Sequence, residues 1–461
     1  MPKPSSRGHP IHAKHALRMH RTVVMLSVAT GLGCVFWTVY FVLRGNVALA
    51  ALEAVLALVA AGSLVLVHRG HNRLAALVLV GSLYVWLSIW CVVMDIPSAQ
   101  VPRAAHHYFL VMGMGTYLMF RGESAWLRHG MSLLCFAAYF GFASSTWGIV
   151  TPYVLPDEVR LPGTWITNAL ALAVVYALLH VMQSDLKAFH ALESDLRKAL
   201  PGNQFLLYYQ PQIGADGRIY GAEALLRWTH PERGLVSPAD FIPVAEQTGL
   251  ILPLGHWVLG TACAQLVMWA ERADSSARTL AVNVSAQQFR QADYVVQVLS
   301  VLERSGANPS RLKLELTESM LVNDMDDIIA KMAALKACGV RLSLDDFGTG
   351  YSSLSYLKKL PLDQLKIDQS FVREVLSNPQ DAAIARTVVV LGQSMGLDVI
   401  AEGVETEGQR AFLADIGCLS YQGYLVSPAL PIADFDRFAE AHNRSLPVPH
   451  TGMETAKQVA C

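Results

Sequence analysis

Charged residues are distributed unevenly along this chain of 461 residues, and this unevenness constrains its fold more than any other feature. They are scarce between residues 22 and 182 and frequent afterwards. The whole chain is 53% hydrophobic and only 16% charged, a composition more apolar than that of an ordinary soluble enzyme. The sequence therefore predicts an α-helical membrane domain over residues 22–182, followed by a soluble domain.

Six apolar stretches lie in the first part, separated by short loops. A helix needs about 20 apolar residues to cross a hydrocarbon core about 30 Å thick, and most of the stretches reach this length. The fourth is the shortest, and the first lacks the cleavage site of an ordinary signal peptide. We expect about six transmembrane helices, at residues 22–43, 46–67, 75–94, 105–120, 131–150 and 162–182.

Lysine and arginine in the short loops predict the orientation, because cytoplasmic loops are enriched in them. Three lie on one side, Arg44, Arg103 and Arg160, and twelve on the other. An even number of spans also places both termini together. We expect a multi-pass membrane protein, surrounded by lipid, with a basic tail (1–21), the soluble domain and a flexible tail (446–461) in the cytoplasm. The twelve are Lys3, Arg7, Lys14, Arg18, Arg21, Arg69, Arg73, Arg121, Arg128, Lys187, Arg197 and Lys198.

Residues 183–200 follow the last apolar stretch and repeat their own apolar residues at helical spacing. They predict a linker helix that leaves the membrane and enters the soluble domain. Two interpretations stay open for this helix. It is a simple connector, or it pairs in parallel with a second copy and transmits a signal, although Glu193 would then occupy a core position of the heptad.

From residue 204 onward, short β-like runs alternate with helix-like runs such as 238–248, 255–272 and 324–338. This alternation is typical of an α/β, TIM-like (β/α)8 barrel, in which parallel strands are covered by helices. We assign the barrel to residues 193–445. The strand runs are FLLYYQP, IYGAEALLRW, TLAVNVS, RLKLELTES, VRLSLDDFG, QLKIDQS, LDVIAEGVE and a last short run near GYLVS.

Polar residues fall at the end of nearly every expected strand. In a parallel barrel these ends converge on one rim, where the active sites of the fold lie. Crowded carboxylates repel one another, and divalent cations relieve the repulsion. Because the donors are oxygen atoms, without histidine or cysteine, two ions of Mg²⁺ or Mn²⁺ are favoured. The residues are Glu223, Asn283, Glu315, Asp345, Asp346, Lys366 and Glu402.

Seven motifs in these runs closely resemble the EAL-domain phosphodiesterases, over roughly residues 193–439. The resemblance implies a barrel that hydrolyses cyclic di-GMP to linear pGpG with Mg²⁺ or Mn²⁺, and a homodimer formed through the barrel. The segment LVSPAL departs from the longer S-x-P spacing that is frequent in the family. The motifs are EALLRW (223–228), NVS (283–285), ELTES (315–319), DDFGTG (345–350), LKID (365–368), AEGVE (401–405) and QGY (422–424).

The resemblance also implies a role for each matching residue. Lys366 would orient or polarise the attacking water, Glu402 is the candidate general base, and Glu318 would brace the DFGTGYSS loop. The residues that would hold the first metal are Glu223, Asn283, Glu315 and Asp345. Those that would hold the second are Asp345, Asp346 and Glu402. Those that would contact the nucleotide are Gln210, Leu226, Arg227, Asp368, Glu405 and Gln422.

Two other classes of protein remain as alternatives. One is a non-catalytic cyclic di-GMP receptor or signalling module; the other is a transporter or channel with an accessory domain, which the small number of spans opposes. A net charge of −1 gives no indication of binding to a nucleic acid polymer. Seven cysteines without a C-x-x-C spacing indicate neither a disulfide framework nor a zinc site.

Ionisable residues within the apolar part are candidates for function. Glu53 is either such a site or a neutral carboxyl that is hydrogen-bonded between helices. The pair His106–His107 could bind a metal or haem, or could anchor the membrane boundary. We expect the six-span region to act as a sensor that regulates the barrel through a continuous helix over residues 165–200, because anchoring alone needs one span.

Overall fold

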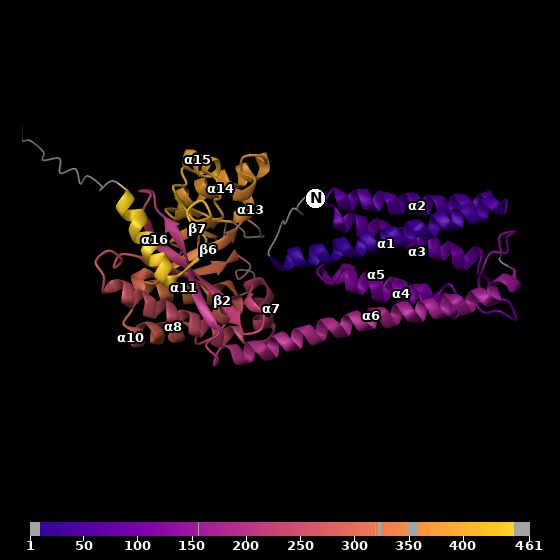
Figure 1. Cartoon of the computed structure of the whole chain (residues 1–461), viewed down its shortest axis with the longest axis horizontal. Helices are drawn as coiled ribbons and strands as arrows, with labels where there is room; N and C mark the ends of the chain where they lie inside the picture. The colour runs from indigo at the N-terminus through magenta and orange to yellow at the C-terminus, as the bar shows by residue number, and fades with distance from the viewer. Residues whose placement is uncertain (1–9, 155, 319, 321–323, 349–356, 447–461) are drawn as a thin grey trace, which may run out of the picture. The chain divides into compact units, whose positions relative to one another are not determined.

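The computed structural model of the chain describes residues 10–154, 156–318, 320, 324–348 and 357–446. The chain divides into two compact units, Met1–His190 and Ala191–Cys461 (Figure 1). The first is helical, and the second contains a sheet surrounded by helices. This division agrees with the change in composition after residue 182.

The first unit contains a helix at each of the six expected positions. Four of these helices, α1, α2, α3 and α6, include a segment long and apolar enough to cross a membrane. Another helix of the described residues that meets this criterion, α8 (Ile251–Ala270), packs against the strands of the barrel. The helices of the first unit are α1 (Pro10–Leu43), α2 (Val47–His68), α3 (Asn72–Val93), α4 (His107–Met119), α5 (Ala125–Ala143) and α6 (Asp157–Ala199).

The fourth and fifth helices differ from the expected spans. Helix α4 has only 13 residues, because the chain from 94 to 106 forms a loop. Helix α5 has 19 residues and starts six residues earlier than expected, at Ala125, where the hydroxyl of Ser124 accepts the N–H of Leu127. Neither meets the length and hydropathy criterion for a span. The expected linker is part of α6, a single helix of 43 residues.

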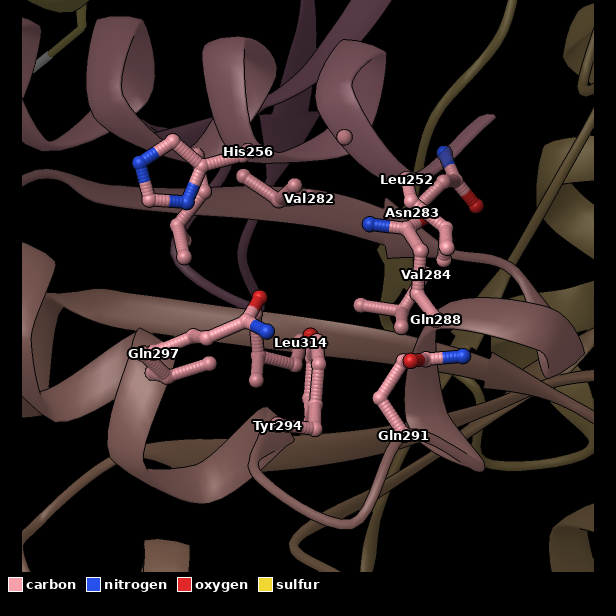
Figure 2. A pocket seen from close by; sticks show the side chains of 13 residues that line it. Leu252, His256, Val282, Asn283, Val284, Gln288, Gln291, Tyr294, Gln297 and Leu314 are labelled. Carbon is pink, nitrogen blue, oxygen red and sulfur yellow. The ribbon is translucent and has the colours of Figure 1, made fainter. Parts of the chain in front are cut away.

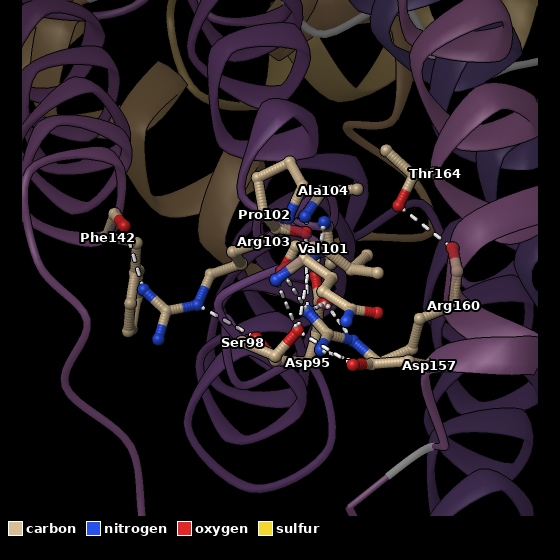
Figure 3. A network of polar contacts seen from close by, with 12 residues as sticks. Asp95, Ser98, Val101, Pro102, Arg103, Ala104, Phe142, Asp157, Arg160 and Thr164 are labelled. Atoms are coloured by element: carbon tan, nitrogen blue, oxygen red, sulfur yellow. Dashed lines mark hydrogen bonds and ion pairs between the residues drawn. The ribbon is translucent and has the colours of Figure 1, made fainter.

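A buried polar network organises the loop between α3 and α4 (Figure 3). The Asp95 carboxylate accepts two backbone N–H groups of its own loop, at 2.7 and 2.8 Å, and pairs with Arg160 on α6 at 3.1 Å. Arg103 donates to the carbonyls of Phe142, at 2.8 Å, and Ser145, at 3.2 Å. Two of the three arginines assigned to the non-cytoplasmic side therefore hold helices together within this unit.

The second unit is a closed barrel of eight strands, and all eight pair in one continuous sheet. Its strands are β1 (Phe205–Ile213), β2 (Ile219–His230), β4 (Thr279–Val284), β5 (Leu312–Thr317), β6 (Arg341–Phe347), β7 (Gln364–Ile367), β8 (Asp398–Ala401) and β9 (Ser420–Tyr421). Two short strands extend the sheet, β3 (Gly234–Val236) and β10 (Leu430–Pro431).

Helices surround this barrel and bury the outward side chains of its strands. The expected helix at 238–248 is confirmed as α7 (Pro238–Thr248), and the next two are α8 and α11 (Met325–Ala337). The remaining helices are α9 (Ala286–Phe289), α10 (Tyr294–Ser305), η1 (Pro309–Arg311), α13 (Gln369–Arg373), α14 (Pro379–Met395), α15 (Glu407–Asp415) and α16 (Ile432–Ser445). One apolar core lies between strands and helices, which leaves the barrel interior for polar side chains.

The direction of β1 is a correction to the expected parallel barrel. Strand β1 pairs antiparallel with both β2 and β9, while β2 and β4 to β9 run parallel. The reason is the connection to β2, a tight turn in which Gly214 N donates to Arg218 O at 2.9 Å. A parallel pair needs a crossover of a dozen or more residues.

The last strand also differs from the expected run near GYLVS, which begins at Gly423. Strand β9 lies just before it, at Ser420–Tyr421. The backbone of Gly423 lies against Val404, where an added Cβ would come within 2.2 Å of the Val404 carbonyl oxygen. The N–H of Leu425 donates to this same carbonyl at 2.9 Å. The run therefore packs against a loop and makes no ladder.

Candidate active site

The ammonium group of Lys366, on β7, lies at the centre of a cluster of carboxylates inside the barrel. Its Nζ atom is 2.5 Å from Glu315 Oε2, 3.3 Å from Asp345 Oδ2 and 3.6 Å from Glu223 Oε2, and it also pairs with Glu402 Oε1. The carboxylates come from β5, β6, β2 and the end of β8. The expected convergence of strand ends is thus present, with Lys366 fully buried among them.

Three amide side chains orient these carboxylates. Asn283, on β4, donates to Glu223 Oε1 at 2.6 Å, and Gln422 donates to Glu223 Oε2 at 2.6 Å and to Glu402 Oε1 at 3.3 Å. Gln212, on β1, donates to the side-chain oxygen of Gln422 at 2.9 Å. Gln422 is only 3% exposed, so in this arrangement its amide group is used for hydrogen bonds to the carboxylates. Gln212 was not among the residues expected from the sequence, although it follows Gln210 by two residues on the same face of β1.

Burial and mutual repulsion shift the pKa values of the cluster. Burial raises the pKa of Glu315 to about 8. The positive charge of Lys366 offsets only part of this effect, and repulsion from Glu223 and Asp345 adds to it. Burial and the same neighbours raise the pKa of Glu402 well above its ordinary value. The opposite holds for Glu223: burial would raise its pKa, but Lys366 and two amide donors lower it. The four carboxylates overcome burial and raise the pKa of Lys366. One ammonium group therefore does not balance the acidic groups.

Asp346 has a left-handed backbone, with φ at +55°, which is uncommon for a residue other than glycine. The ladder between β6 and β7 is irregular at this point, and the N–H of Asp346 donates to Asp345 Oδ1 at 2.9 Å. Burial is the main cause that raises the pKa of Asp346, to about 7, and the neighbouring carboxylates of Asp345 and Asp368 add to the effect. The irregular backbone thus lets two adjacent carboxylates serve one site, although a regular strand would point them to opposite faces.

Glu318 is buried just after β5 and ties this strand to the segment after β6. Its Oε2 atom accepts the backbone N–H of Gly348 at 3.1 Å. This contact is what a brace for the DFGTGYSS loop requires. Residues 349–353 of that loop lie outside the described residues.

The residues expected to contact nucleotide lie around the rim. Gln210 stands opposite Glu223 in the β1–β2 ladder, and the Arg227 guanidinium lies 5.6 Å from the centre of the Tyr208 ring. Leu226 packs against the outer apolar core. Alternation along β2 places its neighbour Leu225 on the face of Glu223 and Arg227, a position that sequence reasoning missed.

The two remaining nucleotide residues follow β7 and β8. Asp368 is nearly buried and caps α13, where its Oδ1 atom accepts the N–H of Ser370 at 2.8 Å. Glu405 is exposed, and its backbone N–H donates to Gln409 Oε1 at 2.8 Å. The Glu405 side chain is thus exposed to solvent, whereas the Asp368 carboxylate lies beside Asp346.

A separate pocket lies on the outer side of the barrel, between α8, β4 and α10 (Figure 2). Side chains that line it include His256, Gln291, Tyr294 and Gln297. Of the expected site residues in the described part of the chain, Asn283 alone lines this pocket. The pocket is therefore not the space enclosed by the carboxylates.

The residues of the cluster fit a hard divalent cation. Within the described residues, no three histidine, cysteine or acidic side chains are already arranged as a metal site, because the carboxylates converge on Lys366. Their oxygen atoms and the amide of Asn283 are nevertheless the donors that Mg²⁺ and Mn²⁺ prefer. Glu315 Oε1 is buried without a hydrogen-bond partner, and a nearby cation would offset the energetic cost of that burial.

A family model matches residues 193–429, just over half of the chain, and its description is the EAL domain. The chain belongs to the EAL-domain family. This membership confirms the resemblance drawn from the seven motifs, and the closed barrel confirms the expected TIM-like fold. The first 192 residues lie outside the match.

Curated EAL relatives are similar over the same part of the chain. The bifunctional diguanylate cyclase/cyclic di-GMP phosphodiesterase MucR of Pseudomonas aeruginosa is 46% identical over 250 residues, which are 54% of this chain and 36% of MucR. The cyclic di-GMP phosphodiesterase PdeR of Escherichia coli is 39% identical over 247 residues, 54% of this chain and 37% of PdeR. The chain thus covers less than two-fifths of the length of these two relatives.

Two solved EAL structures share the fold. The PaMucR phosphodiesterase in complex with c-di-GMP has a TM-score of 0.52 and 46% identity, and the match covers 53% of this chain and 99% of that one. The EAL enzyme Bd1971, bound to cAMP and cyclic-di-GMP, has a TM-score of 0.54 and 31% identity, over 62% of this chain and 76% of that one. Both matches show that this chain shares the fold of these EAL structures.

Proposed function

We propose that this chain is a membrane-bound, metal-dependent phosphodiesterase that hydrolyses cyclic di-GMP to linear pGpG. The observation that carries the proposal is the complete set of acidic and amide side chains from seven motifs around Lys366. EAL relatives with up to 46% identity are named cyclic di-GMP phosphodiesterases, and one of their structures holds c-di-GMP. A complete set favours catalysis over the alternative, a non-catalytic receptor.

The acidic residues would divide between two metal ions. Glu223, Asn283, Glu315 and Asp345 would hold one ion, and Asp345 with Asp346 and Glu402 the other. When bound, Mg²⁺ or Mn²⁺ lowers the pKa of a water molecule and stabilises charge on the phosphoryl oxygens. The metal ions would also replace the protons that burial and repulsion now favour on these carboxyl groups.

Two residues at the centre have distinct tasks in the reaction. Glu402 has a raised pKa, so its carboxylate is a strong enough base to accept a proton from the attacking water. Lys366 stays charged, because the carboxylates around it raise its pKa, and it would donate a hydrogen bond to the water or to a phosphate oxygen. Both side chains are held in place by the contact between them.

The rim would bind the nucleotide. Arg227, aligned with the Tyr208 ring, offers a planar guanidinium group that suits a phosphate or the edge of a guanine. Gln210, Asp368 and Glu405 supply further hydrogen-bonding groups. Leu225 gives an apolar surface on the same face of β2, next to Arg227.

We also propose that the helical unit places the enzyme in the bacterial inner membrane and regulates it, with both termini in the cytoplasm. Four helices with spans of sufficient length and the count of twelve cytoplasmic against three other basic residues support this. The continuous helix α6 supplies a mechanical connection between the helical unit and the barrel. In a homodimer of barrels, a change in the pairing of the two α6 helices would be transmitted along this connection. A coupling of about 1–3 kcal/mol would change the active population roughly 5–150-fold.

Turnover by the full chain in nanodiscs tests the proposal. We expect conversion of cyclic di-GMP to pGpG with Mn²⁺ or Mg²⁺, separated by chromatography, and no conversion when the metal is chelated. Tight binding of cyclic di-GMP without product would instead identify a receptor. Replacing residues 1–182 by an unrelated six-span anchor, with the phase of α6 kept, tests regulation. Unchanged turnover and an unchanged cellular response would reduce this region to an anchor.

A further inference from the structure

A second polar layer lies directly beneath the acidic cluster, inside the barrel. On three adjacent strands, the residue two positions before a member of the cluster is also polar and is at most 4% exposed. Because side chains alternate along a strand, residues two positions apart face the same side, and interior residues of such barrels stack in layers. The pairs are Lys313 below Glu315 on β5, Ser343 below Asp345 on β6, and Gln364 below Lys366 on β7.

Lys313 connects two strands that are not neighbours. Its Nζ atom donates to Gln364 Oε1 at 2.8 Å, across the intervening strand β6. Ser343, on β6, donates to the same oxygen at 3.4 Å. The ring of Tyr220 lies 5.5 Å from the ammonium group, so one side of Lys313 rests on an aromatic face.

The bond between Lys313 and Gln364 repeats a bond in the layer above. Glu315 and Lys366, each two residues further along the same two strands, are joined at 2.5 Å. Two parallel ties therefore join β5 and β7, one in each layer. The lower tie limits how far the two strands can separate, and so it limits the position of Lys366 relative to Glu315.

We propose that Lys313 is a positioning residue for the phosphodiesterase reaction, which acts through Gln364 to hold Lys366 in register with the carboxylates. This inference rests on the proposed function. Lys313 touches no reacting atom, and it makes its contribution from the layer below the site. The chemistry that it supports is the hydrogen bond that Lys366 directs at the water or the phosphate.

Stability alone does not account for a buried lysine. Taking an ammonium group out of water costs several kcal/mol, so a buried lysine adds to stability only where its partners offset that cost. A residue that only supports the fold would lose stability on replacement and keep the turnover number of the folded protein. Replacing a positioning residue lowers the turnover number of the folded protein, so kcat separates the two roles.

Lys313→Met removes the ammonium group and keeps the length of the side chain. In the full chain with Mn²⁺, we expect kcat of the folded variant to fall on the order of tenfold and KM to stay within about twofold. Gln364→Leu should lower kcat by a similar factor, and the double variant should be no worse than the poorer single one, because both break one tie. Lys198→Met, at an exposed lysine of α6, is the matched control and should leave kcat unchanged.

Three results would overturn the inference. One is a kcat for Lys313→Met within twofold of the parent. The second is a double variant whose loss is the product of the single losses. The third is a crystal structure of Lys313→Met in which Lys366 Nζ keeps its distance from Glu315 Oε2. If the parent chain itself fails to hydrolyse cyclic di-GMP, the proposed function fails, and this third result still decides on the positioning.

Discussion

The side-chain amide of Gln422 donates to Glu223 Oε2 at 2.6 Å, although 199 residues separate the two along the chain. Glu223 lies on β2 and Gln422 follows β9, and β1 stands between these strands. The bond therefore spans the place where the sheet closes into a barrel. Because this hydrogen bond lowers the pKa of Glu223, the ionisation of Glu223 depends on closure of the barrel.

We predict that Gln422→Leu lowers activity through Glu223. The amide helps to hold the pKa of Glu223 below its ordinary value, so its loss raises that pKa and lets protons compete with metal. We expect turnover at about pH 4–5, rather than at neutral pH, to need up to roughly tenfold more Mn²⁺, because a shift of one pKa unit is a factor of ten in proton affinity. A metal titration of activity checks this, and an unchanged requirement for Mn²⁺ would contradict it.

Glu223→Ala and Asp345→Ala should each abolish turnover, because each removes an oxygen donor for metal. The measurement is pGpG production by the purified full chain, together with binding of Mn²⁺ followed by electron paramagnetic resonance. Glu407→Ala is the control, since its carboxylate is exposed and pairs with Arg410. Either variant with more than about a tenth of the parent turnover would remove that residue from the metal site.

Lys366→Met should lower kcat and should also make the barrel depend on metal for its stability. Without the ammonium group, several carboxyl groups remain buried together with no positive charge at their centre. Losing one partner of a buried ion pair destabilises proteins by about 3–5 kcal/mol. We expect calorimetry of the metal-free variant to give a lower melting temperature, and Mn²⁺ to restore most of the loss. A metal-free melting temperature equal to that of the parent would contradict this.

The metal-free barrel should lose stability as pH rises from about 5 to 8. Folding raises the pKa of Glu315 to about 8 and of Asp346 to about 7, so the folded state keeps protons that the unfolded state releases above about pH 4. Stability then falls with pH until the folded pKa is passed, and it levels off beyond. Saturating Mg²⁺ should flatten this profile, because metal takes the place of the protons. Calorimetry at several pH values, with and without Mg²⁺, measures both curves.

In the helical unit, Asp95→Ala should be far more damaging than Asp157→Ala. The first change leaves Arg160 buried without its buried partner and frees two backbone N–H groups. We expect a loss of about 3–5 kcal/mol. The Asp157 side chain is 42% exposed, and its pair with Arg160 should contribute at most about 1 kcal/mol. Unfolding of the full chain by a denaturing detergent compares the two, and equal losses would contradict the network in Figure 3.

The sequence predicted the site best where acidic or basic residues stand at the ends of expected strands. Glu223, Glu315, Asp345 and Lys366 were expected on one rim from their positions after apolar runs, and they lie around one point. The helix at 238–248 was expected with the observed bounds, and the structure shows Ser237 and Pro238 at its start and Gly249 at its end.

Other features could not be predicted from local pattern. An alternating run such as FLLYYQP has the same periodicity in either direction, so the reversal of β1 becomes visible only through the short connection of residues 214–218. The limits of α4 and α5 depend on long-range bonds made by Arg103 and Asp95. The tie between Lys313 and Gln364 needs three neighbouring strands to be assembled, because 51 residues separate the two side chains.

The reversal of β1 has a consequence for how such a barrel is attached to other proteins. Its first residue, Phe205, pairs with Trp228 near the carboxyl end of β2, so the chain enters the barrel at the catalytic rim. Five residues, 200–204, separate this point from the end of α6. In a barrel whose first strand is parallel, an upstream segment joins the opposite face. Here the chain that precedes β1 joins the barrel on the rim of the acidic cluster, so an upstream segment is attached there without interrupting any strand that carries a carboxylate of the cluster.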